Sequence, residues 1–311
     1  MQFIEQIHRQ KRRLQKRFIA TKNKYFGTDD KEHSLLSDKS FIEKQFFNIV
    51  GTEIDLRSPQ TYAEKLCWLK LYDRQPRYTR MVDKIESKEW AKELIGSEYI
   101  LPTIGIFNCF DEIDLDMLPE QFILKCSHDS GSYVICRDKS DFDINAAREF
   151  LESRLSFNYY RNCREYPYKN ITPRILAEEF MQNTNGGPVI DYKVYCFGGK
   201  VRIIQVNSGR FLGREPYGDC YDTDWCYLGL QQDHYPMAGD IFPKPDCLDE
   251  LIRISEKLSS DIPTVRVDFN CWNDRLYFGE MTFYDNGGYT TWHPEEWNLK
   301  MGEWIKLPPK R

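Results

Sequence analysis

Two acidic residues, each two positions from a second polar residue, lie late in the chain on neighbouring apolar segments. The first segment contains Arg266-x-Asp268 and the second contains Glu280-x-Thr282, with Asn273-Asp274 as a turn between them. The apolar flanks and the turn predict an antiparallel pair of strands. Residues two apart in a strand face the same side, so Arg266 shares a face with Asp268, and Glu280 shares one with Thr282. Asp268 and Glu280 lie twelve residues apart across the short turn and can sit side by side.

The chemistry of this acidic pair depends on what lies between the two carboxylates. Like charges repel at this distance unless a cation or a proton separates them. Hard oxygen ligands without nearby His or Cys suit Mg²⁺ bound together with a substrate phosphate. Two other interpretations stay open: the acids are unrelated residues of an ordinary strand pair, or Arg266 is a structural ion-pair partner. The apolar flanks indicate buried strands, and buried acids need a partner.

A second candidate site begins at Lys125, which lies at the end of an apolar strand predicted at 121–126. The next residues, 127–132, are mostly small and include Gly131, and a further apolar strand is predicted at 133–136. Small residues let backbone N–H groups approach phosphate oxygens, and a lysine supplies positive charge. Taken alone, the same pattern also fits an ordinary turn.

Several catalytic classes find no support in the sequence. There is no G-x-x-x-x-G-K-[ST] loop and no G-x-G-x-x-G after a strand, so P-loop and Rossmann proteins are excluded. There is no G-x-S-x-G elbow and no Cys–His pair with local support, so an acyl-enzyme mechanism is unsupported. His128 is expected to be a loop histidine rather than a catalyst, and Asp129 is given no role.

Composition limits the partners that the chain can take. Its 311 residues carry 43 Lys and Arg against 48 Asp and Glu, a net charge of −5, which gives no reason to expect nucleic acid. No apolar stretch reaches the roughly 18–20 residues of a membrane span, and we expect no secretory signal. Ten scattered cysteines form no C-x-x-C pair, so reduced thiols in a cytoplasmic protein are expected.

Residues 1–20 are predicted to form a basic amphipathic helix. Positions 9–17 hold six basic residues, and apolar residues recur at helical spacing at Phe3, Ile7, Leu14 and Phe18. One interpretation is a solvated helix whose apolar stripe packs on the protein body. The other is peripheral contact with an anionic membrane surface.

The order of elements predicts a mixed α and β architecture with two lobes that meet near residue 180. Helices are expected at 62–71, 79–95, 143–158 and 247–259, with a shorter one between 30 and 60. Strands are expected at 101–107, 174–180, 191–197 and 200–206, the last two joined by a Gly198-Gly199 turn. The polar stretch 182–188 is the best hinge candidate.

Together these segments resemble the ATP-grasp superfamily and, within it, the TupA-like ATP-grasp family, which is named after a teichuronopeptide biosynthesis protein. The similarity runs from about residue 61 to 308. The segments that carry it are, in order, Trp68–Asp73, Val82–Lys84, Phe122–Gly131, Asp191–Lys193, Arg266–Phe269, Phe278–Tyr284 and Ile305–Pro308.

The resemblance implies an α+β ATP-grasp fold, in which two α+β subdomains clamp a nucleotide. The expected divisions are a helical, basic N-terminal segment (1–60), a substrate-side region (61–110), a lid subdomain (111–180) and a catalytic, metal-binding subdomain (181–311).

The resemblance also implies roles for single residues. The expected nucleotide-phosphate contacts are Lys84, Lys125, Lys193 and the flexible cover at 128–132 with Ser130, Gly131 and Ser132. Glu178 and Glu179 resemble the adenine-side edge, and Asp191 a ribose contact. The expected magnesium ligands are Asp268, Glu280 and Thr282. Relatives commonly have Asn in place of Thr282. Arg266 and Lys125 are expected to act on the transferring phosphoryl group.

The function that the resemblance implies is an ATP- and Mg²⁺-dependent carboxylate–amine ligase that acts through an acyl phosphate. The family name points to joining an amino acid to a uronic acid of a bacterial surface polysaccharide, such as a capsule or other cell-envelope glycan, on the cytoplasmic face. The alternatives are a sugar kinase or glycosyltransferase of polysaccharide biosynthesis, or a non-catalytic nucleotide- or glycan-binding protein.

Overall fold

The computed structural model describes residues 36–184, 189–208, 217–233, 237, 239 and 242–310. The chain divides into two compact units, residues 1–54 and 55–311. The described part of the first unit contains helix α3 (Asp38–Val50), which begins after the Ser37 N-cap and ends at Gly51. The helix expected between 30 and 60 is therefore present, whereas the basic helix predicted at 1–20 lies outside the described residues.

The second unit begins with three helices, α4 (Tyr62–Tyr72), α5 (Arg77–Val82) and α6 (Glu86–Ile95). A capping box starts α4: the Thr61 hydroxyl accepts from the Glu64 backbone N–H, and the Glu64 carboxylate accepts from the Thr61 backbone N–H. The predictions at 62–71 and 79–95 are confirmed, the second as a pair of helices. Three short 3₁₀ turns follow, η1 (Ser97–Tyr99), η2 (Phe110–Glu112) and η3 (Leu115–Met117).

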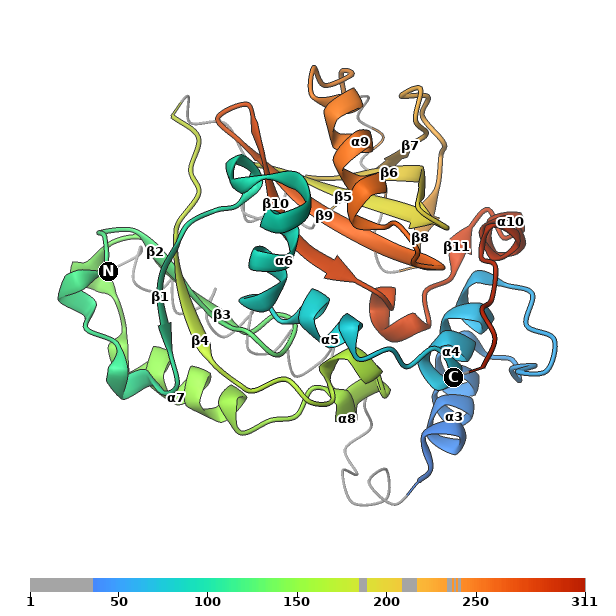
Figure 1. Cartoon of the computed structure of the whole chain (residues 1–311), viewed down its shortest axis with the longest axis horizontal. Helices are drawn as coiled ribbons and strands as arrows, with labels where there is room; N and C mark the ends of the chain where they lie inside the picture. The colour runs from blue at the N-terminus through green and yellow to red at the C-terminus, as the bar shows by residue number, and fades with distance from the viewer. Residues whose placement is uncertain are drawn as a thin grey trace. The chain divides into compact units, whose positions relative to one another are not determined.

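A four-stranded antiparallel sheet follows, in the order β1-β4-β2-β3. Its strands are β1 (Thr103–Phe107), β2 (Phe122–Cys126), β3 (Tyr133–Cys136) and β4 (Ile175–Glu179). Alternation along β2 buries Phe122 and Leu124 in a core shared with α7 (Ile144–Leu155), which packs along β2 (Figure 1). Lys125 therefore projects from the opposite face of the sheet. Between β3 and β4 lie η4 (Lys139–Asp141), α7, α8 (Tyr160–Cys163) and η5 (Tyr166–Tyr168).

The second large sheet is antiparallel with five strands in the order β10-β9-β5-β6-β7. Its strands are β5 (Ile190–Phe197), β6 (Lys200–Ser208), β7 (Tyr217–Tyr221), β9 (Thr264–Trp272) and β10 (Arg275–Thr282). Gly198-Gly199 joins β5 to β6 and Asn273-Asp274 joins β9 to β10, both with positive φ as two-residue hairpin turns require. Both predicted hairpins are confirmed.

The β9–β10 ladder contains a β-bulge. Phe278 pairs with Phe269, and the next pair is Glu280 with Asp268, so Gly279 is the extra residue. A Cβ atom at Gly279 would lie 3.1 Å from the carbonyl oxygen of Asp268, closer than a side chain tolerates without a shift. The bulge therefore sets which residues of β10 lie opposite Asp268.

Helix α9 (Leu248–Leu258) packs on β5 and β6 and covers one face of the five-stranded sheet (Figure 1). The remaining elements are β8 (Gln231–Gln232), which pairs with β11 (Trp292–His293), the turn η6 (Asp285–Gly288) and α10 (Glu296–Trp304). The sequence analysis did not predict β7, β8, β11, α8 or α10. Among the described residues, no helix combines the length and apolarity needed to cross a membrane.

Candidate active site

One face of the five-stranded sheet is polar, whereas the face under α9 is apolar. Strand alternation and register place nine polar side chains on the polar face: Glu280 and Thr282 of β10, Arg266 and Asp268 of β9, Asp191, Lys193 and Tyr195 of β5, and Gln205 and Asn207 of β6. The candidate residues of the second half of the chain are therefore gathered on one surface, although they come from four strands.

Asp268 and Glu280 are direct cross-strand partners, as the sequence analysis expected. Asp268 is buried and accepts from Lys193 Nζ at 2.7 Å and from Arg266 Nε and Nη2 at 2.6 and 2.8 Å. Burial raises the pKa of the Asp268 carboxyl, but Arg266 and Lys193 outweigh it and hold this pKa at about 2. Asp268 is thus ionised at neutral pH.

Arg266 is held by several acceptors at once. Besides Asp268, its guanidinium donates from Nη1 to Asp285 and from Nη2 to the Thr282 hydroxyl at 3.1 Å, while Glu280 Oε1 lies 3.8 Å away. Burial opposes the charge, but Asp268 and Asp285 raise the pKa of Arg266 well above its usual value. Of the five N–H groups of a guanidinium, these contacts within the described chain leave one on Nη1 for another acceptor.

Asp285 holds the Nη1 group of Arg266, whereas Asp268 holds Nε and Nη2. The buried Asp285 carboxylate also accepts from Tyr195 at 3.0 Å and from Gln232 at 2.6 Å. Asp285 follows β10 by three residues and was not predicted, because nothing in the local sequence connects it to Tyr195 or Gln232.

The donor set fits magnesium. Glu280 is one-third exposed, and its Oε1 accepts from the Thr282 hydroxyl at 3.3 Å. A carboxylate offers about four lone-pair directions, so three hydrogen bonds to Asp268 and one to Glu280 leave room for a cation. No group of three His, Cys, Asp or Glu residues in the described segments could hold a metal alone. Mg²⁺ bound by one or two carboxylates together with substrate phosphates needs no such group.

Lys193 and Asp191 also meet on this face. Lys193 Nζ lies 3.3 Å from Asp191 Oδ2, and Asn207 donates to Asp191 at 3.4 Å. Lys193 thus lies between two buried carboxylates. The expected roles of Lys193 at phosphate and of Asp191 at ribose stay predictions.

On the four-stranded sheet, Glu178 forms an ion pair with each of two lysines. Lys125 Nζ lies 2.5 Å from Glu178 Oε2, and Lys88 Nζ contacts Oε1. Burial raises the pKa of Glu178, but the two lysines overcome it and lower this pKa to about 2. Glu179 lies on the opposite side of the strand and is exposed. The two glutamates predicted to edge adenine therefore point apart, and Glu178 engages Lys125.

Lys88 was missed by the sequence analysis. It is buried on α6 and also donates to the Leu101 carbonyl at 2.8 Å and to the Thr103 hydroxyl at 3.0 Å. No spacing rule connects a helical lysine to a glutamate ninety residues later, so only the fold reveals this contact.

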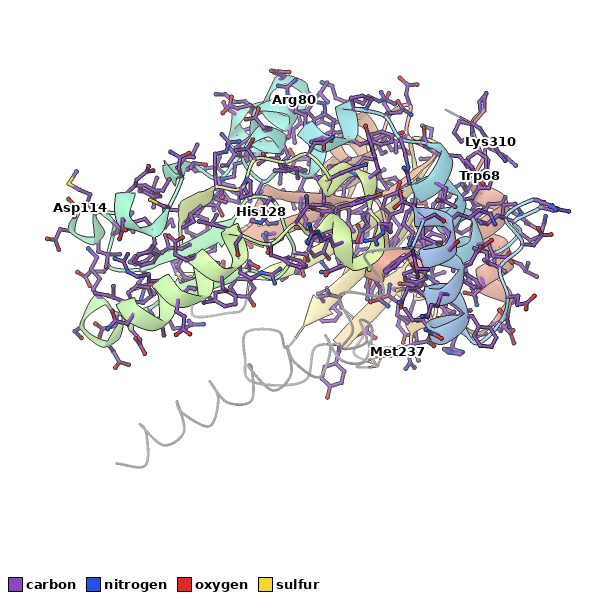
Figure 2. All side chains as sticks on the ribbon, turned by 90° about the horizontal axis from the view of Figure 1, so that it is seen from below. Trp68, Arg80, Asp114, His128, Met237 and Lys310 are labelled. Carbon is purple, nitrogen blue, oxygen red and sulfur yellow. The ribbon has the colours of Figure 1, made fainter. Side chains whose placement is uncertain are left out.

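The predicted phosphate cover at 128–132 has a fixed base and an exposed tip. Asp129 is buried and accepts from Arg154 of α7 at 2.7 and 2.9 Å, and Ser132 donates to the same oxygen. His128, labelled in Figure 2, contacts the carbonyls of Arg154 and Phe157 at 3.0 and 3.1 Å through Nε2. Asp129 and His128 thereby have structural roles.

The tip of this loop and Lys84 remain accessible. Ser130 and Gly131 are exposed, and Gly131 has φ +80°, a conformation that favours glycine. The Lys84 backbone N–H donates to the Ser127 carbonyl at 3.1 Å, and its ammonium donates to the Asp129 carbonyl. Lys84 therefore lies at the base of the loop, and its role at phosphate stays a prediction.

A short segment joins the two sheets. Trp272 Nε1 donates to the Gln182 carbonyl at 2.9 Å, and the Asn273 backbone N–H donates to Asn183 Oδ1 at 2.8 Å. The described start of the hinge candidate, 182–184, thus rests on the β9–β10 turn, and its residues 185–188 lie outside the described part.

Comparison with protein families gives one match that covers most of the chain. A family model described as TupA-like ATPgrasp matches residues 64–306. Comparison with curated proteins gives no significant match.

Solved structures give more distant similarities. The D-alanine–D-alanine ligase of Bacillus anthracis in complex with ATP is 13% identical with a TM-score of 0.37, over 65% of this chain and 53% of that one. That of Helicobacter pylori is 15% identical with a TM-score of 0.40, over 79% and 69%. The ATP-grasp ligase PsnB with minimal precursor, Mg and ADP is 10% identical with a TM-score of 0.38, over 71% and 57%.

The chain spans only a little more than half the length of the Bacillus anthracis and PsnB chains. The family match therefore carries the relationship.

Proposed function

The chain belongs to the TupA-like ATP-grasp family and has its α+β fold, and from this premise we propose that it is an ATP- and Mg²⁺-dependent carboxylate–amine ligase. The reaction would activate a carboxylate as an acyl phosphate and join it to an amine. Each predicted site residue keeps its proposed role as nucleotide, metal or phosphoryl ligand.

The observation that carries this proposal is the pairing of Asp268 with Glu280 beside Arg266. Two acids lie opposite each other across a ladder, on a face that also holds Lys193. Such a cluster combines oxygen ligands for a cation with fixed positive charge for phosphoryl oxygens. If the two acids were unrelated residues of a surface hairpin, a buried arginine would not be needed beside them. Here the buried Arg266 contacts both Asp268 and Asp285.

The described residues would divide the work as follows. Asp268, Glu280 and the neutral hydroxyl of Thr282 would hold Mg²⁺, which supplies charge neutralisation at the phosphates when bound. Arg266, fixed by Asp268 and Asp285, would direct its remaining N–H at the transferred phosphoryl group.

Lys125 of the four-stranded sheet and Lys84, which lies between α5 and α6, would contact the nucleotide phosphates. The exposed tip at Ser130 and Gly131 would cover those phosphates and exclude water, which protects an acyl phosphate from hydrolysis.

The reaction balances without a covalent protein intermediate. A substrate carboxylate oxygen attacks the γ-phosphorus of ATP and ADP leaves, which gives the acyl phosphate. The amine nitrogen then attacks the acyl carbon, inorganic phosphate leaves, and the amine gives up a proton as the amide forms. The products are therefore ADP, phosphate and an amide.

The substrates are a finer proposal that rests on the family's name. We propose that the carboxylate is a uronic acid of a bacterial surface polysaccharide and that the amine is an amino acid. The reaction would take place on the cytoplasmic side of the membrane, before the glycan is exported.

The test is incubation of the protein with ATP, Mg²⁺, uronic-acid glycans and a panel of amino acids. We expect phosphate release that needs both a glycan and an amine, together with an amide product by mass spectrometry. Phosphate found on the glycan would instead identify a sugar kinase, and glycan extension without ATP consumption a glycosyltransferase. Nucleotide binding with no turnover on any pair would favour a non-catalytic binding protein.

A further inference from the structure

A fully buried lysine contacts the turn that follows β10. The ammonium of Lys70, on α4, donates to the carbonyl oxygens of Gly287 at 2.6 Å and Cys163 at 3.3 Å. The same nitrogen lies over the ring of Tyr289, 3.9 Å from the ring centroid. Burial of an ammonium costs free energy unless its donors are satisfied, and these contacts are as many as the three N–H donors of a lysine. The function proposed above gives Lys70 no role.

The turn that Lys70 contacts, η6, has an unusual backbone. Asn286, Gly287 and Gly288 follow one another with φ of +49°, +67° and +83°. Left-handed conformations cost free energy in residues other than glycine, and they persist only where surrounding contacts hold them. A Cβ atom at Gly287 would lie 2.5 Å from Cys163 Sγ, so the end of α8 packs closely against the turn. The conformation of η6 therefore depends on its neighbours.

Three side chains donate hydrogen bonds to backbone carbonyls of η6. Lys70 and Cys67 lie three residues apart on one face of α4, and Cys67 Sγ donates to the Gly288 carbonyl at 3.5 Å, next to the carbonyl that Lys70 holds. The Thr290 hydroxyl donates to the Asp285 carbonyl at 3.1 Å. Of these three donors only Lys70 carries a charge, and charge-assisted hydrogen bonds are the stronger kind. We therefore expect Lys70 to contribute most to holding the turn.

The turn matters to the candidate site because its first residue, Asp285, holds Arg266. The Asp285 carboxylate accepts from Arg266 Nη1, from Tyr195 at 3.0 Å and from Gln232 at 2.6 Å. The backbone of η6 sets the position of this carboxylate, so a shift of η6 would move Asp285 and the guanidinium with it. Small displacements of a group that binds reacting atoms have large effects on binding and rate.

We propose that Lys70 is a positioning residue for phosphoryl transfer, which holds η6 so that Asp285 directs Arg266 at the γ-phosphoryl group of ATP. This inference rests on the proposed function. Lys70 is fully buried and uses its donors inside the protein, so it acts through Arg266 rather than on the nucleotide itself. Its loss should therefore affect binding of the γ-phosphate and leave the rest of the nucleotide site intact.

The test compares magnesium-dependent binding of ADP and of the non-hydrolysable ATP analogue AMP-PNP to the full-length protein by calorimetry. Lys70→Met keeps a long, unbranched side chain but removes the charge and the donors. We expect this variant to weaken binding of AMP-PNP about tenfold and that of ADP by no more than about twofold, because ADP lacks the γ-phosphate.

The same helix supplies a matched control. Lys65 also lies on α4 and also donates to two backbone carbonyls, those of Gly302 at 2.8 Å and Ile305 at 3.1 Å. These carbonyls belong to α10 and the residue that follows it, not to η6. Lys65→Met should therefore leave the ratio of the two affinities unchanged.

Two further variants show whether the effect passes through the turn. Adding Lys70→Met to Asp285→Asn should weaken AMP-PNP no further than Asp285→Asn alone, whereas the effects of independent sites add. Thr290→Val removes the hydroxyl that holds the Asp285 carbonyl and keeps the shape of the side chain. It should shift the ratio of the two affinities in the same direction, and it tests the turn even if Lys70→Met does not fold.

Equal weakening of both nucleotides by Lys70→Met, the same change of ratio in Lys65→Met, or additive losses in the double variant would overturn this inference. An unchanged ratio in Thr290→Val would overturn it as well. A wild-type protein that binds neither nucleotide would instead overturn the proposed function on which the inference rests.

Discussion

Arg266 binds both carboxylate oxygens of Asp268, from Nε at 2.6 Å and from Nη2 at 2.8 Å, and both residues belong to β9. They lie two apart on the same face, so the strand itself sets their geometry. The side-on contact keeps Asp268 ionised beside the carboxylate of Glu280. An ion pair and a magnesium site are therefore compatible here. Arg266 and Lys193 donate three hydrogen bonds to Asp268, and a carboxylate offers about four lone-pair directions, so one is left for a cation.

The acidic pair can be tested by removing its negative charge. Glu280→Gln should weaken magnesium-dependent binding of ADP by on the order of 10²-fold, because a carboxylate ligand becomes a neutral amide. Calorimetry with and without Mg²⁺ measures this effect. Glu256→Gln is a matched control, since Glu256 pairs with exposed Lys200 on the other side of the sheet. Equal magnesium dependence in Glu280→Gln and the wild type would remove Glu280 from the metal site.

The ion pairs of Glu178 predict a large effect on stability. Glu178→Gln should lower the free energy of unfolding by about 3–5 kcal/mol at pH 7, because Lys88 would be left buried without its partner. Since the pKa of Glu178 is lowered to about 2, its contribution is complete above the ordinary glutamate pKa and is lost as the pH falls toward 2. Urea unfolding from pH 7 to pH 3 should show the two proteins converging. The exposed neighbour serves as control: Glu179→Gln should change the free energy by no more than about 0.5 kcal/mol.

Glu165 predicts a pH dependence of the opposite sign. Burial raises the pKa of this carboxyl to about 8, although Lys70 opposes the shift. The native state then keeps a proton that the unfolded chain has lost, so stability falls as pH rises from the ordinary glutamate pKa to about 8. The slope from this group is about 1.4 kcal/mol per pH unit. Glu165→Gln should remove that slope in urea unfolding between pH 5 and 8, whereas exposed Glu149→Gln should keep it. A slope that survives in Glu165→Gln would show that Glu165 titrates normally.

The base of the 128–132 loop is held by one arginine. Arg154→Gln should increase amide hydrogen exchange across this loop by about tenfold or more, because buried Asp129 loses its charged partner. Arg148→Gln lies on the same helix but removes an exposed pair with Asp111 and a contact with the Phe110 ring, both outside the loop. It should therefore leave the loop unchanged. Unaltered exchange in Arg154→Gln would mean that Ser132 and Lys84 suffice to hold the loop.

The sequence predicted the elements whose residues interact locally. The hairpins at Gly198-Gly199 and Asn273-Asp274 follow from short-range alternation and turn residues. The same hairpin brings Asp268 near Glu280, but their direct pairing depends on the bulge at Gly279, which alternation does not predict. Even the alternative in which Arg266 pairs with an acid is observed. The short strands β8 and β11 have only two residues each, too few to produce a periodic pattern.

What the sequence could not predict are the partners that long-range folding selects. Lys88 reaches Glu178 from a helix, and Asp285 reaches Arg266, Tyr195 and Gln232 from a turn. Each contact joins elements whose relative placement depends on the packing of whole sheets. The charge of such residues is visible in the sequence, but the choice of partner is not.

The single extra residue at Gly279 decides on which side of the sheet an acid emerges. Phe278 packs against Phe269 on the apolar side, with ring centroids 6.2 Å apart. In an uninterrupted ladder Glu280, two residues later, would share that side and face Val267, so its charge would point into hydrocarbon. The extra residue Gly279 shifts the alternation of inward- and outward-facing side chains along β10 by one position. Glu280 therefore emerges on the polar face of the sheet, where its carboxylate can remain charged.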